Sequence, residues 1–253
     1  MRKKRMFYSI QFVVLFFVDS KGEKGSIKMF FVKVWLLLFA LAGCAKEVHV
    51  VLFVIDDVGM SDLSIYNRSN DIQTPVFNNL LSESILLNKH YSNPVCSPSR
   101  ASLMQGRHSW KTGLQQYNTI MPASTAALNS KLTLAEVLKE KDYETFAIGK
   151  WHLGYSSWKN TPTQRGFSSH KGYFQGEIDY YNKSFAIPSQ FLPFPHIQGL
   201  DWWENETVIR SESSVYNKDL YDKELIRVLD QRNASRPLFL YFAHQLVSLF
   251  FCS

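Results

Sequence analysis

Apolar and polar positions along the chain predict strands that alternate with helices. Residues 48–55 form an almost unbroken apolar and β-branched run, which is typical of a strand buried on both faces. This run ends abruptly at Asp56 and Asp57. Similar runs predict strands over residues 143–148 and 238–243. Because helical segments separate these strands, the pattern predicts an α/β fold with a largely parallel central sheet flanked by helices.

The helices carry recognisable start signals. Thr74 is a good capping residue, and the proline after it suits the first helical position. Thr133 and Glu136 have the spacing of a capping box, in which each residue bonds the backbone N–H of the other. The helices expected from these and similar patterns cover residues 75–81, 134–141 and 215–231.

Composition and charge separate the first 45 residues from the rest. The chain is 45% apolar over 253 residues, enough for a sizeable core. The first 45 residues contain eight Lys or Arg and two acidic residues, which leaves 20 basic and 20 acidic residues beyond them. The net charge of +6 therefore belongs to this leader, and the balanced remainder gives no reason to expect a nucleic-acid partner.

Residues 29–45 have the features of a secretory signal peptide, with a basic residue, an apolar core and small residues near the end. We therefore expect Met29 to be the true start and residues 1–28 to be an upstream extension. The apolar run is shorter than the roughly 20 residues that a membrane span requires. A bacterial lipoprotein signal, with Cys44 lipidated, is the alternative.

Four Asn-x-Ser/Thr sequons favour a eukaryotic secretory route and predict surface glycosylation. They lie at Asn67, Asn182, Asn205 and Asn233. After removal of a signal peptide, Cys96 and Cys252 are the remaining cysteines. We therefore expect no disulfide framework, which leaves Cys96 free for modification.

Two groups of polar residues follow predicted strands. The adjacent carboxylates of Asp56 and Asp57 suit a hard cation such as Ca²⁺, although an Asp pair after a strand is also typical of a turn. Lys150 and His152 lie two apart at the end of an extended segment, so their side chains are expected on the same face. A surface lysine and a core histidine are the alternative reading of that pair.

A third group opens a helix. Cys96 and Arg100 are four residues apart, Pro98 lies in the first turn, and Gly106 is a suitable end. The two side chains therefore share a face near the positive end of the helix dipole, where anions bind. Since parallel strands end at one edge of a sheet, the three groups together describe a site for a monoanionic or dianionic ester.

An ordered series of motifs between residues 51 and 243 resembles the type I sulfatases, and the segments 162–167 and 172–181 are most similar to the arylsulfatase B group. The series includes Val-Ile-Asp-Asp-Val-Gly at 54–59, Cys-Ser-Pro-Ser-Arg at 96–100 and Ala-Ile-Gly-Lys-Trp-His-Leu-Gly at 147–154. The resemblance implies an alkaline-phosphatase-like fold. It implies a partial catalytic domain over residues 46–245, truncated at the C-terminus and followed by an aberrant apolar tail, residues 246–253.

The same resemblance implies the nucleophile and the metal. A formylglycine-generating enzyme would oxidise Cys96 to formylglycine, whose hydrate attacks the sulfate. Asp56 and Asp57 would bind Ca²⁺ together with the modified Cys96. The implied substrates are sulfate esters of aryl compounds or of amino sugars in glycosaminoglycans, and the implied location is the lysosome or the extracellular space.

Further roles and two departures follow from the resemblance. Arg100 would hold the nucleophilic hydroxyl, Lys150 would contact the sulfate, and His152 would take the proton that restores the aldehyde. Ser248 stands where the family has the histidine that protonates the leaving alcohol, and His244 lies four residues too early to replace it. The chain also stops before the family's Asp-Asn pair, so we expect weak metal binding.

Three functions remain open at this point. The first is hydrolysis of sulfate esters. The second is an inactive truncated isoform that binds sulfated glycans without turnover. The third is hydrolysis of phosphate or phosphonate esters by a member of the same superfamily, because that chemistry also uses a metal, cations and a nucleophile. Nothing in the pattern predicts an oligomeric state.

Overall fold

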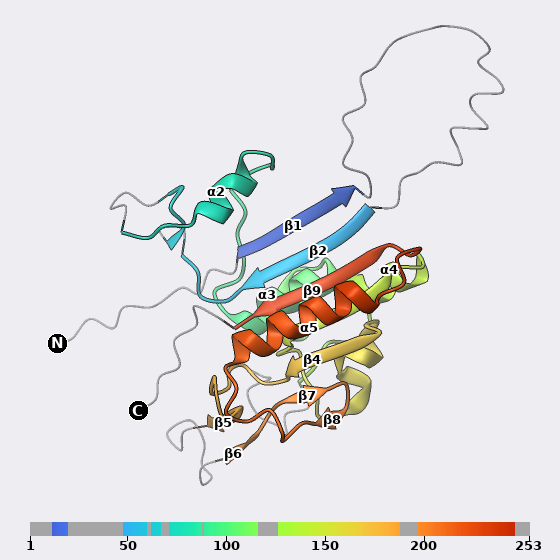
Figure 1. The fold of residues 1–253 in the computed structure, drawn as a ribbon. Coiled ribbons are helices and arrows are strands. Elements are labelled where there is room, and N and C mark those ends of the chain that lie inside the picture. Colours follow the sequence, from blue (N-terminus) through green and yellow to red (C-terminus); the bar gives the residue numbers. More distant parts are fainter. Residues whose placement is uncertain are drawn as a thin grey trace, which may run out of the picture.

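A seven-stranded sheet in the order β1-β2-β9-β3-β4-β7-β8 forms the centre of the molecule (Figure 1). Its parallel strands are β2 (Val48–Ile55), β9 (Leu238–His244), β3 (Glu144–Lys150) and β4 (Ser169–Tyr173). The edge strands β1 (Phe12–Asp19) and β7 (Trp203–Glu204) pair antiparallel with β2 and β4, and β8 (Thr207–Val208) pairs antiparallel with β7. The computed structural model describes residues 12–19 (backbone), 48–59, 62–66, 71–87, 89–115, 126–187 and 197–245.

Helices cover both faces of the sheet. Helix α5 (Asn217–Gln231) lies on one face, and α3 (Cys96–Gln105) and α4 (Leu134–Glu140) lie on the other (Figure 1). Helix α2 (Pro75–Leu81) has no buried residue and lies to one side of the sheet. The smaller elements are η2 (Ser109–Lys111), η3 (Trp158–Asn160), η4 (Pro162–Arg165) and a two-stranded sheet of β5 (Ser184–Ile187) and β6 (Ile197–Leu200).

The central strand β9 separates two hydrophobic cores. Its residues are all buried, and alternate side chains join opposite faces. Leu240 and Phe242 pack in the core beneath α5, whereas Phe239 and Tyr241 pack in the core that contains residues of α3 and α4. The predicted largely parallel sheet with flanking helices is therefore confirmed, and the alternation explains why the run 238–243 has no polar face.

The local predictions differ in how well they hold. The capping box of α4 is confirmed, because Glu136 N–H donates to Thr133 Oγ1 at 3.1 Å and Thr133 N–H donates to Glu136 Oε2 at 2.6 Å. Helix α2 begins at Pro75 with Thr74 at the N-cap position, as predicted, but the Thr74 side chain makes no capping hydrogen bond. Thr74 Oγ1 accepts a hydrogen bond from the backbone N–H of Ser64 at 3.0 Å, so this hydroxyl fixes a distant loop and does not close the helix end.

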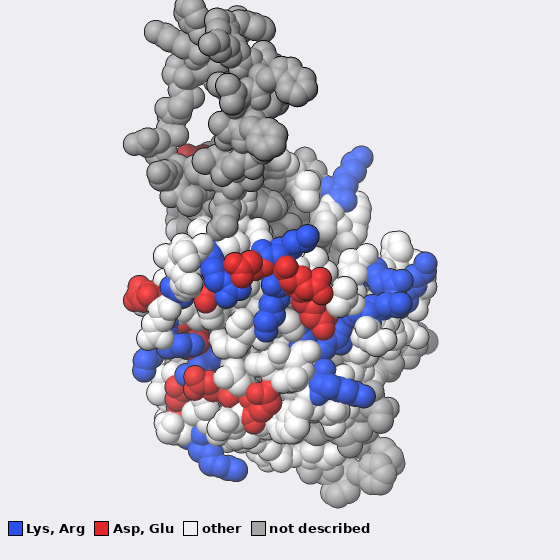
Figure 2. Space-filling view, turned by 90° about the vertical axis from the view of Figure 1, so that its right-hand side faces the viewer, with Lys and Arg blue, Asp and Glu red and all other residues white. Residues whose placement is uncertain are grey.

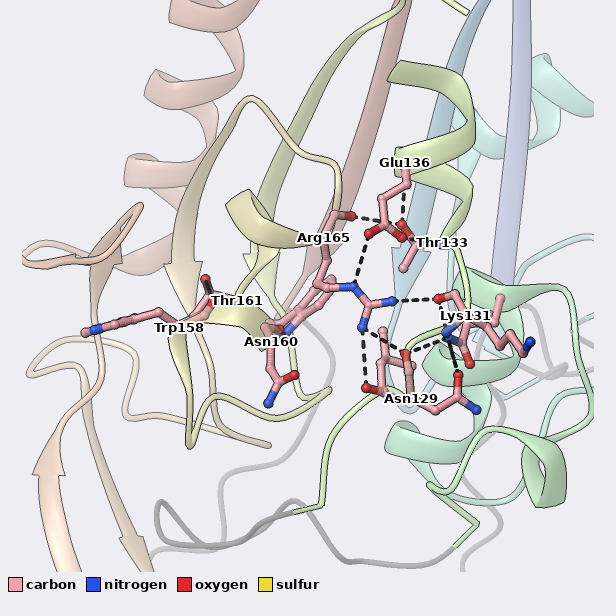
Figure 3. A network of polar contacts seen from close by, with 11 residues as sticks. Asn129, Lys131, Thr133, Glu136, Trp158, Asn160, Thr161 and Arg165 are labelled. Carbon is pink, nitrogen blue, oxygen red and sulfur yellow. Dashed lines mark hydrogen bonds and ion pairs between the residues drawn. The ribbon is translucent and has the colours of Figure 1, made fainter. Parts of the chain in front are cut away.

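Arg165, from the segment that resembles the arylsulfatase B group, joins α4 to a neighbouring loop (Figure 3). Its guanidinium donates to the carbonyls of Lys131 at 2.8 Å and Asn129 at 3.2 Å, and it lies 3.4 Å from Glu136 Oε1. Its own carbonyl accepts from Thr133 Oγ1 at 2.9 Å. This residue therefore stabilises the fold and contributes no chemistry at the strand ends.

The leader enters the described structure at one place. Strand β1 pairs with the outer edge of β2 over eight residue pairs, from Phe12 with Ile55 to Asp19 with Val48. Removal of the leader would uncover this edge, and open edges favour pairing with other chains. The predicted signal peptide, the sequon at Asn67 and the tail 246–253 lie outside the described residues, so the predicted domain boundaries stay predictions.

Two surface features complete the fold. In the view of Figure 2, Lys and Arg side chains are interleaved with Asp and Glu, as the equal numbers of basic and acidic residues beyond the leader lead one to expect. Within the part of the chain that the structure describes, no helix has the length and apolar character needed to cross a bilayer.

Candidate active site

Three elements bring the predicted site residues to one edge of the sheet. Asp56 follows the last residue of β2, Lys150 is the last residue of β3, and Cys96 is the first residue of α3. Strand β9 lies between β2 and β3 and runs parallel to both. The carboxyl ends of these strands therefore meet at the edge where open α/β sheets bind ligands.

The approach of β3 to its neighbour requires a glycine. Gly149 has φ of 97°, and a Cβ atom at this position would lie 2.0 Å from the carbonyl oxygen of Ala243. A side chain is therefore excluded by both strain and contact. Gly149 lets the end of β3 lie close to β9 and places Lys150 beside the end of β2.

A buried carboxylate lies at the centre of the site. Asp56 is 2% exposed, and its Oδ2 lies 2.6 Å from Lys150 Nζ and 3.1 Å from a terminal nitrogen of Arg100. Burial by itself raises the pKa of Asp56, but Arg100 and Lys150 outweigh burial and hold that pKa well below its usual value. Asp56 is therefore charged, and the three groups together carry one net positive charge.

Arg100 connects this centre to the sheet. Its side chain is fully buried and donates to the carbonyl oxygen of Lys150 at 2.8 Å and to Tyr241 Oη at 2.6 Å. Burial lowers the pKa of the guanidinium, but Asp56 opposes this and the net shift is upward. Within the described residues, Arg100 Nε is buried without a hydrogen-bond partner, so the site holds an unused donor.

The candidate nucleophile faces a histidine. Cys96 Sγ lies 3.0 Å from His152 Nδ1, and the carbonyl of His152 accepts from Ser97 Oγ at 3.0 Å. Burial lowers the pKa of His152 well below its usual value, and Lys150 and Arg100 lower it further. His152 is therefore a neutral imidazole, which has one nitrogen available to accept a proton.

The prediction that the side chains of Lys150 and His152 leave the same face of one strand is wrong, although both residues reach the site. Strand β3 ends at Lys150, and His152 has φ of 53°. A left-handed backbone turns the imidazole away from its strand position. The two residues meet because of this turn and because His152 N–H donates to the carbonyl of Phe174 at 3.1 Å.

The two adjacent aspartates have different surroundings. Asp56 is buried, whereas Asp57 is exposed and has φ of 59°. The described residues contain no group of three or more His, Cys, Asp or Glu side chains able to hold a metal. Ca²⁺ takes 6–8 oxygen ligands. Asp56 and Asp57 therefore do not make a complete calcium site from the described residues.

Residues 174–180 reach this site and were assigned no role by the motifs. Partial burial raises the pKa of Glu177, which interacts electrostatically with Lys150 and Asp57. Burial likewise raises the pKa of Tyr180 to about 12, and this residue also interacts with Asp57. Both belong to a segment that the sequence resemblance contains, but their nearness to Asp57 depends on the path of the chain after β4.

His244 does not join the site. It ends β9 beside Ile55, and its ring packs edge-on against Tyr221 at 5.4 Å and Phe242 at 5.5 Å. These neighbours belong to the core beneath α5, whereas Cys96 comes from the helix on the opposite face. His244 therefore faces the side of the sheet opposite the helix that begins at Cys96. Ser248 itself lies outside the described residues.

Fold and site together define an α/β protein with a buried, positively charged cluster at the carboxyl edge of its sheet. Residues 48–245 match the family model Sulfatase, and the chain belongs to the sulfatase family. It is 32% identical to mouse arylsulfatase J over 204 residues, and 30% identical to mouse N-acetylgalactosamine-6-sulfatase over 219 residues. Each alignment covers 80% of this chain, but 33% and 40% of the relatives, so the chain spans well under half of their length.

A solved sulfatase structure has the same fold. The crystal structure of the PsFucS1 sulfatase from Pseudoalteromonas sp. superposes with a TM-score of 0.59 and 24% identity, over 84% of this chain and 46% of that one. The alkaline-phosphatase-like architecture implied by the sequence motifs is thus confirmed for the part of the fold that the chain contains.

We predict that Asp56→Asn destabilises the protein by about 3–5 kcal/mol at pH 7, because it leaves two buried cations without their carboxylate. The folded pKa of Asp56 lies below its unfolded value of 3.8, so this stabilisation is fully present above that value and is lost as pH falls through the folded pKa. Urea unfolding of both proteins should show the difference at pH 7 and a smaller one below pH 3.8.

The exposed neighbour supplies the control for this prediction. Asp57→Asn removes the same charge from the next residue without uncovering a buried cation, and surface changes typically stay within about 0.5 kcal/mol. Equal losses for Asp56→Asn and Asp57→Asn would contradict the central role of Asp56.

Proposed function

We propose that this chain is a sulfuric ester hydrolase that cleaves sulfate esters of aryl or amino-sugar substrates through a formylglycine made from Cys96. The observation that carries the proposal is the position of Cys96 Sγ, 3.0 Å from a neutral imidazole at the start of α3. The family membership and the named relatives support the substrate class, since one of them is an N-acetylgalactosamine-6-sulfatase.

The net charge of Asp56, Lys150 and Arg100 bears on which class of ester this site suits. With His152 neutral, Lys150 and Arg100 exceed Asp56 by one positive charge. A sulfate monoester carries one negative charge, which this excess balances, whereas a phosphate monoester carries up to two at neutral pH. The first turn of α3 adds donors for the ester oxygens. The triad by itself therefore matches the charge of a sulfate monoester, before the charges of Asp57 and of bound Ca²⁺ are added.

The chemistry follows from the pair at the start of α3. Hydrated formylglycine has two hydroxyls. One attacks sulfur, which breaks the bond from sulfur to the alcohol oxygen, and its proton passes through solvent to the alcohol that leaves. The other hydroxyl loses its proton when sulfate is expelled and the aldehyde returns. His152 is placed to accept that proton, because its Nδ1 faces the side chain of residue 96 and burial keeps the ring neutral. Lys150 and Arg100 hold the charge on the sulfate during attack.

We predict that the secreted chain carries formylglycine at position 96 and hydrolyses an aryl sulfate in preference to the matching aryl phosphate. Peptide mass spectrometry and two parallel assays measure this. Cys96→Ser removes the modification, and His152→Gln removes the proton acceptor, with an expected loss of about 10²-fold or more in rate. An unmodified Cys96 in a host that contains the modifying enzyme, or a preference for the phosphate, would falsify the proposal.

The calcium part of the proposal has its own test. Asp56 and Asp57, with the modified residue 96, would hold the ion, which would supply positive charge to the sulfate. With so few ligands we predict a dissociation constant no tighter than about 10⁻⁴ M. Isothermal titration of CaCl₂ into the chain measures it, and Asp57→Asn should weaken it further. Micromolar affinity would show that other residues complete the site.

Passage through the secretory pathway, to the lysosome or the extracellular space, completes the proposal, and the sequons offer a test. Asn182 and Asn233 are exposed, and the side-chain oxygen of each accepts from the serine two residues later. Asn205 is half-buried, and its side-chain oxygen accepts from His170 N–H at 2.9 Å. A glycan therefore fits the folded protein best at the first two positions.

We predict high glycan occupancy at Asn182 and Asn233 and low occupancy at Asn205 in a eukaryotic secretory host. Glycopeptide mass spectrometry measures the occupancy of each position. Single Asn→Gln variants at the first two positions should each shift the gel mobility by one glycan. Full occupancy at Asn205 alone would contradict the exposure argument.

A further inference from the structure

We propose that Asp201 is a positioning residue for His152. Its carboxylate fixes residues 174–176 against the imidazole ring, and this contact determines how His152 faces Cys96. The catalytic consequence rests on the proposed sulfate ester hydrolysis, whereas the contacts themselves can be tested without turnover. Asp201 is distant in sequence from every motif that resembles the sulfatases' catalytic residues.

The first observation concerns the surface that His152 rests on. A Cβ atom added at Gly176 would lie 3.0 Å from Cε1, 3.1 Å from Nε2 and 3.5 Å from Nδ1 of the His152 ring. The backbone of Gly176 therefore lies flat against the imidazole. His152 N–H also donates to Phe174 O at 3.1 Å, so residues 174–176 hold both the backbone and the ring.

The second observation concerns what fixes residues 174–176. Asp201 is 2% exposed, and its carboxylate accepts from Gln175 N–H at 2.7 Å and from Phe174 N–H at 3.1 Å. It also accepts from Trp203 Nε1 at 2.6 Å, and the Trp203 ring stacks on Phe174 at 5.0 Å. One side chain therefore holds two consecutive backbone N–H groups of the segment that touches His152.

A carboxylate suits this position better than any neutral side chain. Three N–H donors point at Asp201, and two carboxylate oxygens can accept all of them. An asparagine has one acceptor oxygen, and its NH₂ group would face an N–H donor. Burial raises the pKa of Asp201 to about 6, and among the described residues no cation forms an ion pair with it. The charge on Asp201 is thus retained although its burial costs free energy. The three N–H donors explain why a carboxylate stands at this position.

The test compares, in the full chain, two carboxylates that each accept a hydrogen bond from a tryptophan Nε1. Glu212 accepts from Trp202 Nε1 at 2.6 Å and from Lys171 Nζ at 2.7 Å, and these partners of its carboxylate, among the described residues, lie outside residues 174–176. The variants are Asp201→Asn and Glu212→Gln. Each folded protein is treated with diethyl pyrocarbonate, which acylates accessible imidazole nitrogen, and modification of the His152 peptide is followed by mass spectrometry.

We expect His152 to be modified about tenfold faster in Asp201→Asn, a factor that corresponds to the loss of about one net hydrogen bond. Glu212→Gln should leave the rate at the wild-type value. Equal rates for Asp201→Asn and the wild type would overturn the inference, and so would equal acceleration in Glu212→Gln. If circular dichroism shows that Asp201→Asn does not fold, Trp203→Phe takes its place, because it removes one donor and keeps a ring against Phe174. An unchanged rate in Trp203→Phe overturns the inference in that case.

Activity separates this inference from the proposed function. On an aryl sulfate, Asp201→Asn should lower kcat with little change in KM, because His152 acts after the substrate is bound. A loss of kcat/KM that comes entirely from a higher KM, with kcat unchanged, would overturn the positioning role. A wild-type chain without sulfatase activity would instead count against the proposed function, and the modification rates of His152 would still decide the inference.

Discussion

The ion pairing of Asp56 with Lys150 and Arg100 is the interaction on which the rest of the site depends. It holds Lys150 at the end of β3 and Arg100 in the second turn of α3, and it does so in the buried interior of the sheet edge. Removing Asp56 would leave two buried cations without their partner. The same triad leaves one excess positive charge, so the arrangement that stabilises the fold also selects an anion.

The site is supported from both sides of the triad. Arg100 donates a hydrogen bond to Tyr241 on β9, which ties the helix that begins at Cys96 to a fully buried strand. On the other side, the His152 ring lies against Gly176, and Asp201 accepts hydrogen bonds from the backbone N–H groups of the neighbouring Phe174 and Gln175. Cys96, the proposed nucleophile, and His152, the proposed proton acceptor, are therefore fixed by different parts of the chain, which would suit a reaction that needs them about one hydrogen bond apart.

Resemblance to a family does not give a residue its role. Arg165 belongs to a segment that resembles one group of sulfatases, yet it bonds α4 and a loop and lies in the structural framework. His244 is a titratable residue at the carboxyl end of a central strand, yet its ring packs beneath α5. In each case the contacts that the side chain makes, and not its motif, decide what it can do.

The sequence by itself determined the family, the alternating strands and helices, and the identity of the residues that gather at the strand ends. It could do so because long apolar runs, caps and the group around Cys96 are local signals. The tertiary structure alone decided that Asp56 is buried and Asp57 exposed, that a left-handed His152 meets Cys96, and that Asp201 lies behind them. These facts depend on backbone turns and on contacts between segments far apart in the chain, which no local pattern records.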